Sequence, residues 1–381
     1  MDTLFIPLSL TAGALLAVQA GANAQLAKAA GSPFVATTLQ LAVAALLLLL
    51  ATFATGSVAA LSLLSNAPWW HAVGGTASAF YVVSAILLFP RIGAVVTVGL
   101  FIAGQVLASM ALDVFGLLGI APTGLSLAGA AGAVLVLTGA ALIVLGQHDA
   151  QRPIARGQIG WTALALAAGA VLPVQGAVNA LLRHDLGGAA FAVGTVSFIV
   201  ATLAMAAAQI VTAALPGTAK PSLTDSLQGL ASLPWWGWLG GFAGATYVTT
   251  VFASIPAIGA AATVGLTVAG QQVASVFVDR YGWMRLPKRP VSTMRLTGVA
   301  VLLAGANYPW YALMLVALIA LSGRWEWLPA AAAAYLPYFV GALDLQQEPM
   351  KKLSYGTATA LVLVLVALRA SSQRRGAGLA G

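Results

Sequence analysis

A long stretch of this chain occurs twice, and the repeat constrains the fold more than any other feature. Residues 68–119 match residues 234–285 at 24 of 52 positions when they are aligned at a constant offset of 166. PWWHAVGGTASAFYV in the first copy aligns with PWWGWLGGFAGATYV in the second, and PRIGAVVTVGL aligns with PAIGAAATVGL. Upstream, VQAGANAQL (18–26) aligns with VQGAVNALL (174–182). The chain therefore contains two copies of one structural unit.

Both copies consist mainly of apolar segments, such as Pro33–Thr55 and Leu125–Gly146. Segments of about 20 apolar residues are long enough to cross a bilayer core as helices. Only 7% of the residues are charged, whereas soluble domains carry about 25%. The fold class that we expect is an all-α polytopic membrane protein.

The pattern predicts ten membrane-spanning helices, five in each copy. In the first copy they lie near 4–27, 33–55, 69–89, 93–112 and 125–146, and in the second near 159–182, 190–213, 235–255, 259–278 and 291–306. We expect four regions: a first five-helix repeat (1–148), a cytoplasmic hinge (149–158), a second repeat (159–306) and an appended hydrophobic tail (307–381) with two or three further spans.

An odd number of spans in each copy predicts that the second copy enters the membrane upside down. If the N-terminus is extracytoplasmic, fourteen of the seventeen Lys and Arg residues fall on the cytoplasmic side, as the positive-inside rule requires. The equivalent loops 113–124 and 279–290 carry zero and four basic residues. Inverted repeats that meet around a midplane site are typical of secondary transporters. The sequence therefore predicts a multi-pass transporter whose N-terminus is extracytoplasmic.

The ordered motifs Q-x3-N-x2-L, GSP, PWW-x3-GG, a following Tyr, P-x-[IL]-G, AGQ-x3-S and D-x2-G resemble the YdcZ-like branch of the drug/metabolite transporter superfamily. The resemblance covers roughly residues 4–306. It implies a bacterial inner-membrane exporter of small molecules with two inverted halves, and it implies no particular substrate. The sequence departs from the pattern at 187–190, where GGAA replaces GSP, and in its long tail.

Two pairs of amide side chains occupy equivalent positions in the first span of each copy. Gln19 and Asn23 are one helical turn apart, and Gln175 and Asn179 repeat them. An amide in hydrocarbon is unfavourable unless it is paired, so these faces should point into the bundle. They either contact the solute from both halves or hold helices together through hydrogen bonds.

A stripe of polar residues runs along one face of the fourth span in each copy. It consists of Gln105, Ser109 and Asp113 in the first copy and of Gln271, Ser275 and Asp279 in the second. Residues four apart stay on one helix face, and twenty residues of helix cover about 30 Å, so each aspartate lies at a membrane boundary. We expect it to be a turn or gate residue, or a coupling group for protons. A carboxylate near a helix C-terminus needs a partner, either backbone N–H groups of the following turn or a loop cation such as Arg280.

Two further repeated features fall within or between the spans. FPRIGA (89–94) and IPAIGA (255–260) place Pro and Gly between consecutive spans, which indicates a tight helical hairpin or a broken helix beside the solute path. Tyr81 and Tyr247 follow small residues in the middle of a span. Each either directs its hydroxyl into a cavity or is a buried, hydrogen-bonded tyrosine.

These observations predict a transporter that moves a small organic solute by alternating access of two halves. The residues that we expect to line its site are Gln19, Asn23, Tyr81, Gln105, Gln175, Asn179, Tyr247 and Gln271, with Asp113 and Asp279 as gate or coupling groups. The partners are the lipid bilayer and a neutral or amphipathic solute, with protons as one candidate coupling ion. We expect no catalytic residues, cofactor, metal or nucleic acid.

Two other classes of protein stay open. The segment PWYALMLVALIALSGRWEWL (309–328) faintly resembles the C-terminal end of some polytopic glycosyltransferases, which would make the tail part of a fusion. That class requires an acidic motif in an early loop, and only Asp2 precedes the first loops. A non-transporting membrane scaffold is the other alternative.

Overall fold

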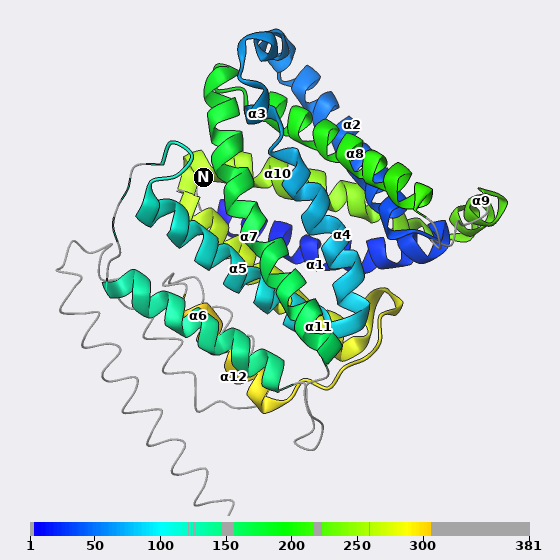
Figure 1. Ribbon diagram of the computed structural model, residues 1–381, viewed down its shortest axis with the longest axis vertical. Helices are drawn as coiled ribbons and strands as arrows, with labels where there is room; N and C mark the ends of the chain where they lie inside the picture. The colour runs from blue at the N-terminus through cyan, green and yellow to red at the C-terminus, as the bar shows by residue number, and fades with distance from the viewer. Residues whose placement is uncertain are drawn as a thin grey trace, which may run out of the picture. The chain divides into compact units, whose positions relative to one another are not determined.

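The computed structural model describes residues 4–120, 122, 124, 127–146, 156–215, 223–258 and 260–305, and its regular elements there are all helical (Figure 1). The helices of the first copy are α1 (Phe5–Ala30), α2 (Pro33–Ala54), η2 (Ser57–Asn66), α3 (Trp69–Ala72), α4 (Gly75–Ile92), α5 (Ala94–Phe115) and α6 (Leu127–Leu145). Those of the second are α7 (Arg156–Asp185), α8 (Ala190–Ala214), α9 (Leu223–Ser232), η3 (Trp235–Trp238), α10 (Leu239–Ile258), α11 (Ala260–Tyr281), η4 (Trp283–Arg285) and α12 (Thr293–Gly305). Most of the expected hinge and the whole expected tail lie outside the described residues.

Six helical segments of the described chain are long and apolar enough to cross a membrane. They are Phe5–Ala30, Pro33–Ala54, Trp69–Ile92, Ala94–Phe115, Ile159–Asp185 and Ala190–Ala214. Shorter apolar helices include Ala130–Leu145 and Thr293–Leu302. The protein is therefore an all-helical polytopic membrane protein, and the count of ten spans in two inverted sets stays a prediction.

Capping residues and glycines fix where neighbouring helices end and begin. Gly31, which ends α1, has a φ of +69°, and the Ser32 hydroxyl accepts a hydrogen bond from the Val35 N–H at the start of α2. Between α4 and α5 the link is Gly93 alone, with a φ of +88°. Only glycine adopts such a conformation without strain. The first Pro–Gly element therefore forms a tight hairpin.

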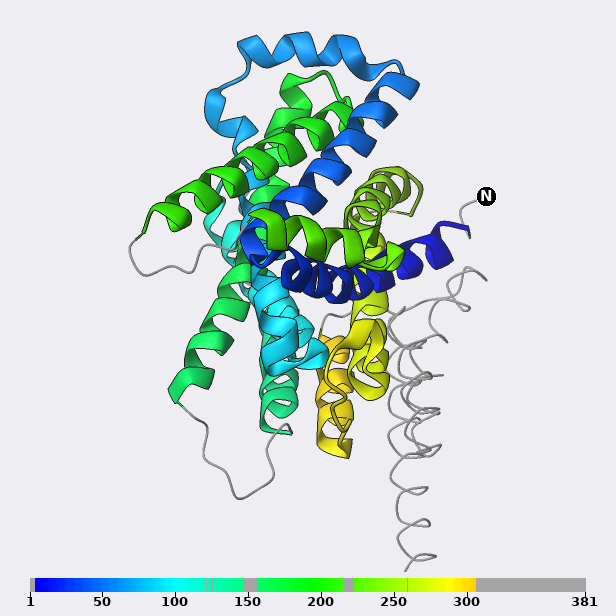
Figure 2. The same ribbon diagram turned by 90° about the vertical axis from the view of Figure 1, so that its right-hand side faces the viewer.

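Helices of the first copy pack mainly against helices of the second. The closest pairs are α1 with α11, α5 with α7, α2 with α8, and α6 with α12. Figure 1 shows α2 lying along α8. Helix α6 lies beside α12 in Figure 1 and in the turned view of Figure 2. Under the sequence repeat α1 corresponds to α7 and α5 to α11, so the first two pairs are equivalent to each other. The two copies are thus interlocked rather than separate.

Equivalent glycines lie at the crossing points of these two pairs. A Cβ on Gly13 would collide with the backbone of Thr267, and one on Gly270 with that of Leu10, where α1 crosses α11. In the other pair Gly169 and Gly104 abut the backbones of α5 and α7 in the same way. Small residues let membrane helices approach closely. The glycines therefore set the spacing of both crossings.

Apolar side chains cover the outside of the bundle as well as its inside. Leu46 and Leu50 on α2 and Leu203 and Ile210 on α8 are each more than half exposed. Leu41, Leu48, Phe198 and Ala201 on the inner faces of the same helices form part of a buried cluster. Helices that are apolar on all faces are typical of membrane spans. The exposed faces of α2 and α8 are therefore suited to lipid.

Candidate functional site

A small cavity lies in the interior of the bundle between α1, α4, α5 and α11. It is lined by Leu16, Gln19, Ala20, Asn23, Tyr81, Val82, Ala85, Phe89, Phe101 and Gln271. Four of the eight residues predicted to line a site are among them, from both copies of the repeat. The cavity leaves about 20 Å³ open to the centre of a water molecule, which is room for about one water. A larger solute can enter only after the helices move apart.

The two glutamines of this cavity are held by neighbouring polar side chains. Gln19 Nε2 donates to Gln40 Oε1 on α2 at 2.9 Å. Gln271 Nε2 donates to the Tyr81 hydroxyl at 2.9 Å. The Tyr81 ring lies 4.6 Å from the Phe101 ring, centroid to centroid. The polar edge of the cavity is thus ordered by contacts between the two copies, because Gln271 belongs to the second and Tyr81 to the first.

Asn23 has a different environment from the other amides of the cavity. Its side chain is 1% exposed, and neither Nδ2 nor Oδ1 has a hydrogen-bond partner within the described chain. Leaving a buried polar group unpaired costs about 1–3 kcal/mol. Asn23, a residue of the cavity wall, therefore has an unsatisfied donor and an unsatisfied acceptor, and its Oδ1 lies against Gly240 of α10.

The second amide pair occupies the equivalent place in the other copy but does not line the cavity. Gln175 Nε2 donates to Ser78 and Ser197, at 2.6 and 3.2 Å, and Asn179 Nδ2 donates to Ser197 at 3.4 Å. A Cβ on Gly74 would lie 2.7 Å from Asn179 Oδ1, and Gly240 abuts Asn23 in the same manner. The pairs are therefore equivalent in position and differ in their partners.

The other two predicted site residues, Gln105 and Tyr247, are also not among the residues that line the cavity. Gln105 is partly buried in the middle of α5. Tyr247 is partly buried on α10, and its side chain is hydrogen-bonded to Thr267. The structure therefore brings together Gln19, Asn23, Tyr81 and Gln271, and leaves Gln105, Tyr247 and the Gln175 pair elsewhere.

Several polar residues of the interior were missed by the sequence analysis. Gln40 on α2 binds Gln19, and Ser197 on α8 binds Gln175 and Asn179. Gln40 and Ser197 occupy the same position counted from the first residue of each helix. Gln272, 0% exposed, has no hydrogen-bond partner for its side-chain amide in the described chain. A lone polar residue inside an apolar span was the signal that could have identified Gln40 and Ser197.

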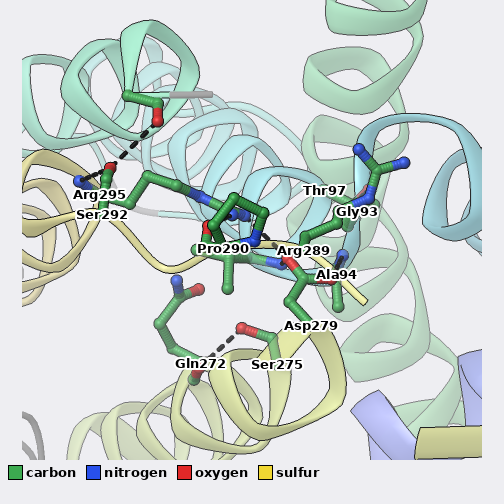
Figure 3. Close-up of polar contacts among 12 residues, drawn as sticks. Gly93, Ala94, Thr97, Gln272, Ser275, Asp279, Arg289, Pro290, Ser292 and Arg295 are labelled. Carbon is green, nitrogen blue, oxygen red and sulfur yellow. Dashed lines mark hydrogen bonds and ion pairs between the residues drawn. The ribbon is translucent and has the colours of Figure 1, made fainter. Parts of the chain in front are cut away.

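The second aspartate of the repeat, Asp279, is the centre of a buried ionic cluster (Figure 3). Its carboxylate accepts hydrogen bonds from the backbone N–H groups of Ala94 at 2.7 Å and Val95 at 3.1 Å, at the start of α5. Arg295 on α12 donates to it at 2.7 Å, and the side chains of Asp279 and Arg295 are 3% and 2% exposed. The expectation that the backbone of the following turn or Arg280 would hold this carboxylate is wrong. The carboxylate instead caps a helix of the other copy, which has glycine in its capping position, and pairs with Arg295.

Arg289 completes the cluster at its outer side. Its Nη2 donates to the carbonyl oxygens of Pro90 and Arg91, at 3.0 and 2.8 Å. Burial lowers the pKa of the Arg289 guanidinium, and the neighbouring Asp279 carboxylate opposes this effect. The loop after α11 is therefore fastened to the α4–α5 hairpin.

The first aspartate of the repeat, Asp113, is exposed. At the offset of 166, Thr123 and Gly129 stand where the second copy has Arg289 and Arg295. The two aspartates share a sequence motif, and only the second has arginines at these positions. The ionic cluster is therefore a feature of one end of the bundle.

A second ionic contact joins α3 to the end of α7. His71 Nδ1 contacts Asp185 Oδ2, and the two side chains are 10% and 21% exposed. The Trp70 ring stands edge-on to the His71 ring at 4.0 Å between centroids. Glycine occupies the position equivalent to His71 in the second copy, Gly237. Sequence analysis assigned no role to this histidine, because its partner is far away in the chain.

Within the described chain no three His, Asp or Glu side chains gather as they would around a metal ion. What the structure offers is a polar cavity inside an apolar helical bundle, closed by contacts between two interlocked repeats. Polar side chains inside a membrane bundle of this kind are typical of the solute pathway of a transporter.

The comparisons with known proteins identify the family. The model of the family described as "Putative inner membrane exporter, YdcZ" matches the chain twice, over residues 4–142 and 160–308. The chain belongs to this family, in a duplicated form. No curated protein matches. A solved structure named "Crystal structure of protein" is 18% identical and covers 78% of this chain and 94% of its own, with a TM-score of 0.49.

Proposed function

We propose that the protein is a secondary transporter that exports a small neutral or amphipathic organic solute across the bacterial inner membrane. The observation that carries the proposal is the central cavity, where Gln19, Asn23 and Tyr81 of the first copy meet Gln271 of the second. Polar side chains inside a membrane bundle are typical of solute pathways. Alternating access would come from the two inverted five-helix halves, 1–148 and 159–306, moving against each other around this cavity.

The other predicted site residues fit this mechanism as parts of a second conformation. Gln105, Gln175, Asn179 and Tyr247 are the equivalents of the cavity residues in the opposite copy. When two inverted repeats exchange conformations, each takes up the arrangement of the other. We therefore propose that these four residues approach the solute when the opposite end of the bundle opens.

The energy source and the aspartates form a separate part of the proposal. Asp279 acts as a gate residue, because its bonds to α5 and to Arg295 fasten one end of the bundle. Asp113 has the exposure that a proton-coupling group would need at the other end. Facilitated transport without a coupling ion is the alternative.

We propose that the N-terminus is extracytoplasmic. This topology is supported by the contacts of basic residues: Arg289 binds the backbone at Pro90, and Arg91 lies over the Trp161 ring. The ends of several helices that carry basic residues thus meet at one end of the bundle, which would be the cytoplasmic end. The chain has no cysteine, so single cysteines can be tested with a reagent that reacts only from outside; Ser62→Cys should be labelled and Lys288→Cys should not. Labelling of Lys288→Cys alone would overturn the topology.

The experiment that tests transport is solute counterflow in proteoliposomes. Wild-type protein should exchange a labelled solute found by an accumulation screen, and Gln271→Leu should lower the rate by at least about tenfold, because Tyr81 loses its partner at the cavity wall. Gln228→Leu makes the same change at an exposed position of α9, outside the cavity, and should transport normally. Full activity of Gln271→Leu would refute the assignment of the cavity.

A further inference from the structure

We propose that the central cavity recognises an uncharged solute through a carboxamide-like group, which pairs with the side chain of Asn23. The proposed group presents a hydrogen-bond acceptor and a hydrogen-bond donor next to each other. This inference rests on the proposed function, because it names the class of solute that the transporter would carry.

The unpaired atoms of Asn23 define what the cavity can bind. Its Nδ2 and Oδ1 are both buried and both without a partner in the described chain, and the residue lines the cavity. A side-chain amide that pairs with another amide makes one bond as donor and one as acceptor. A carboxylate could satisfy only Nδ2, and an ammonium group only Oδ1. A carboxamide satisfies both.

The packing around Asn23 holds the amide in place. Gly240 on α10 lies so close that a Cβ there would overlap Asn23 Oδ1. Gln19, one turn earlier on α1, uses its own Nε2 for Gln40 and so leaves Asn23 unpaired. The amide is therefore held in one orientation in this closed conformation.

The remaining lining of the cavity favours a neutral solute with an apolar body. Among the described residues that line the cavity, Tyr81 is the only titratable one, and its hydroxyl already accepts from Gln271. The arginines and carboxylates of the interior belong to the Asp279 cluster and the His71 contact instead. A charged solute would have no counter-ion in the cavity, which is unfavourable inside a membrane. Phe89, Phe101 and Val82 would surround the apolar part.

A bound water is the competing explanation for the unpaired amide. The cavity has room for about one water, and such a water could bond to both atoms of Asn23. In that case Asn23 would be structural, and the cavity would show no preference among solutes that differ only in this group. The two explanations therefore predict different responses to matched ligands.

Benzamide, benzamidinium and benzoate are suitable probes because they share a ring and differ in the polar group. Their binding to the full-length protein in nanodiscs can be measured as the rise in thermal midpoint with ligand concentration. Benzamide should stabilise the wild-type protein at millimolar concentration, and the two ions should bind at least about tenfold more weakly.

Substitutions of Asn23 test whether this residue makes the distinction. Asn23→Leu should remove the response to benzamide, and Asn23→Asp should transfer the preference to benzamidinium, which pairs with a carboxylate through two parallel bonds. Gly240→Ala, which displaces the amide without changing it, should weaken benzamide binding. Gln228→Leu, at an exposed position of α9, is the control and should respond as the wild type does. If one variant fails to fold, the others decide the question.

Three results would overturn the inference: no response of the wild type to benzamide, an equal response to one of the ions, or an unchanged response in Asn23→Leu. Failure of the proposed function looks different. Benzamide that binds through Asn23 without counterflow would refute transport of this class and keep the recognition. Counterflow of a charged solute that ignores Asn23→Leu would keep transport and refute the recognition.

Discussion

Asp279, in the last turn of α11, accepts a hydrogen bond from the backbone N–H of Ala94, the first residue of α5, at 2.7 Å. The end of one helix in the second copy thus caps the start of the equivalent helix in the first. Arg295 neutralises the same carboxylate. A carboxylate at a helix N-terminus is favourable for the macrodipole of that helix, so the contact stabilises the junction between the copies.

Asp279→Asn should destabilise the protein strongly. The substitution leaves the buried Arg295 guanidinium without a counter-charge, and breaking a buried pair in this way costs about 3–5 kcal/mol. The measurement is the free energy of unfolding in SDS titrations. Asp113→Asn changes the equivalent but exposed residue and should stay within about 0.5 kcal/mol of the wild type. Equal effects of the two substitutions would show that the Asp279 cluster does not hold the bundle together.

Replacing the glycines at the helix crossings should separate the two copies. Gly270→Ala and Gly104→Ala place a methyl group against the backbone of α1 and α7, respectively, and overpacking of this kind costs about 1–3 kcal/mol. Gly176→Ala, on α7 with open space around it, should be neutral or slightly stabilising. The same SDS titration measures all three. A Gly270→Ala protein as stable as Gly176→Ala would mean that the crossing adapts freely.

The sequence predicted the elements that repeat and missed those that do not. The repetition of polar residues in the two copies was sufficient to select Gln19, Asn23, Tyr81 and Gln271, four residues that do line one cavity. Identical motifs could not show that this site is asymmetric. A fold built from two copies holds one conformation at a time, and only one of two equivalent positions can then face the cavity.

The ionic contacts were beyond prediction for a different reason. Arg295 reaches Asp279 only because a loop returns the chain to the bundle, and His71 meets Asp185 across 114 residues of sequence. Neither contact is marked by a regular spacing of residues in the sequence, and neither has a counterpart in the other copy. Single charged residues near span ends are explained equally well by topology, so the sequence alone favoured that interpretation for the loop cations.

Removal of the Asp185 carboxylate should loosen the contact between α3 and α7. Asp185→Asn weakens a largely buried interaction with His71, and hydrogen bonds to charged groups contribute about 1.5–3 kcal/mol. The thermal midpoint should therefore fall. His184→Gln alters the adjacent histidine, whose side chain is 93% exposed, and should leave the midpoint unchanged. If both variants melt with the wild type, the His71 contact contributes nothing measurable.

Breaking the Asp279 cluster should also open one end of the bundle to water. Ser275, one turn before Asp279 on α11, is 0% exposed, so a Ser275→Cys thiol should resist a membrane-impermeant maleimide in vesicles that expose this end. Adding Asp279→Asn removes the bonds to α5 and Arg295, and the thiol should then react, since a gate that has lost its ionic contacts spends more time open. Lys288→Cys, exposed in the following loop, should react at the same rate with and without Asp279→Asn and so reports the accessible fraction. A Ser275→Cys thiol that stays protected in the Asp279→Asn background, while Lys288→Cys is fully labelled, would assign Asp279 to stability alone and exclude it as a gate.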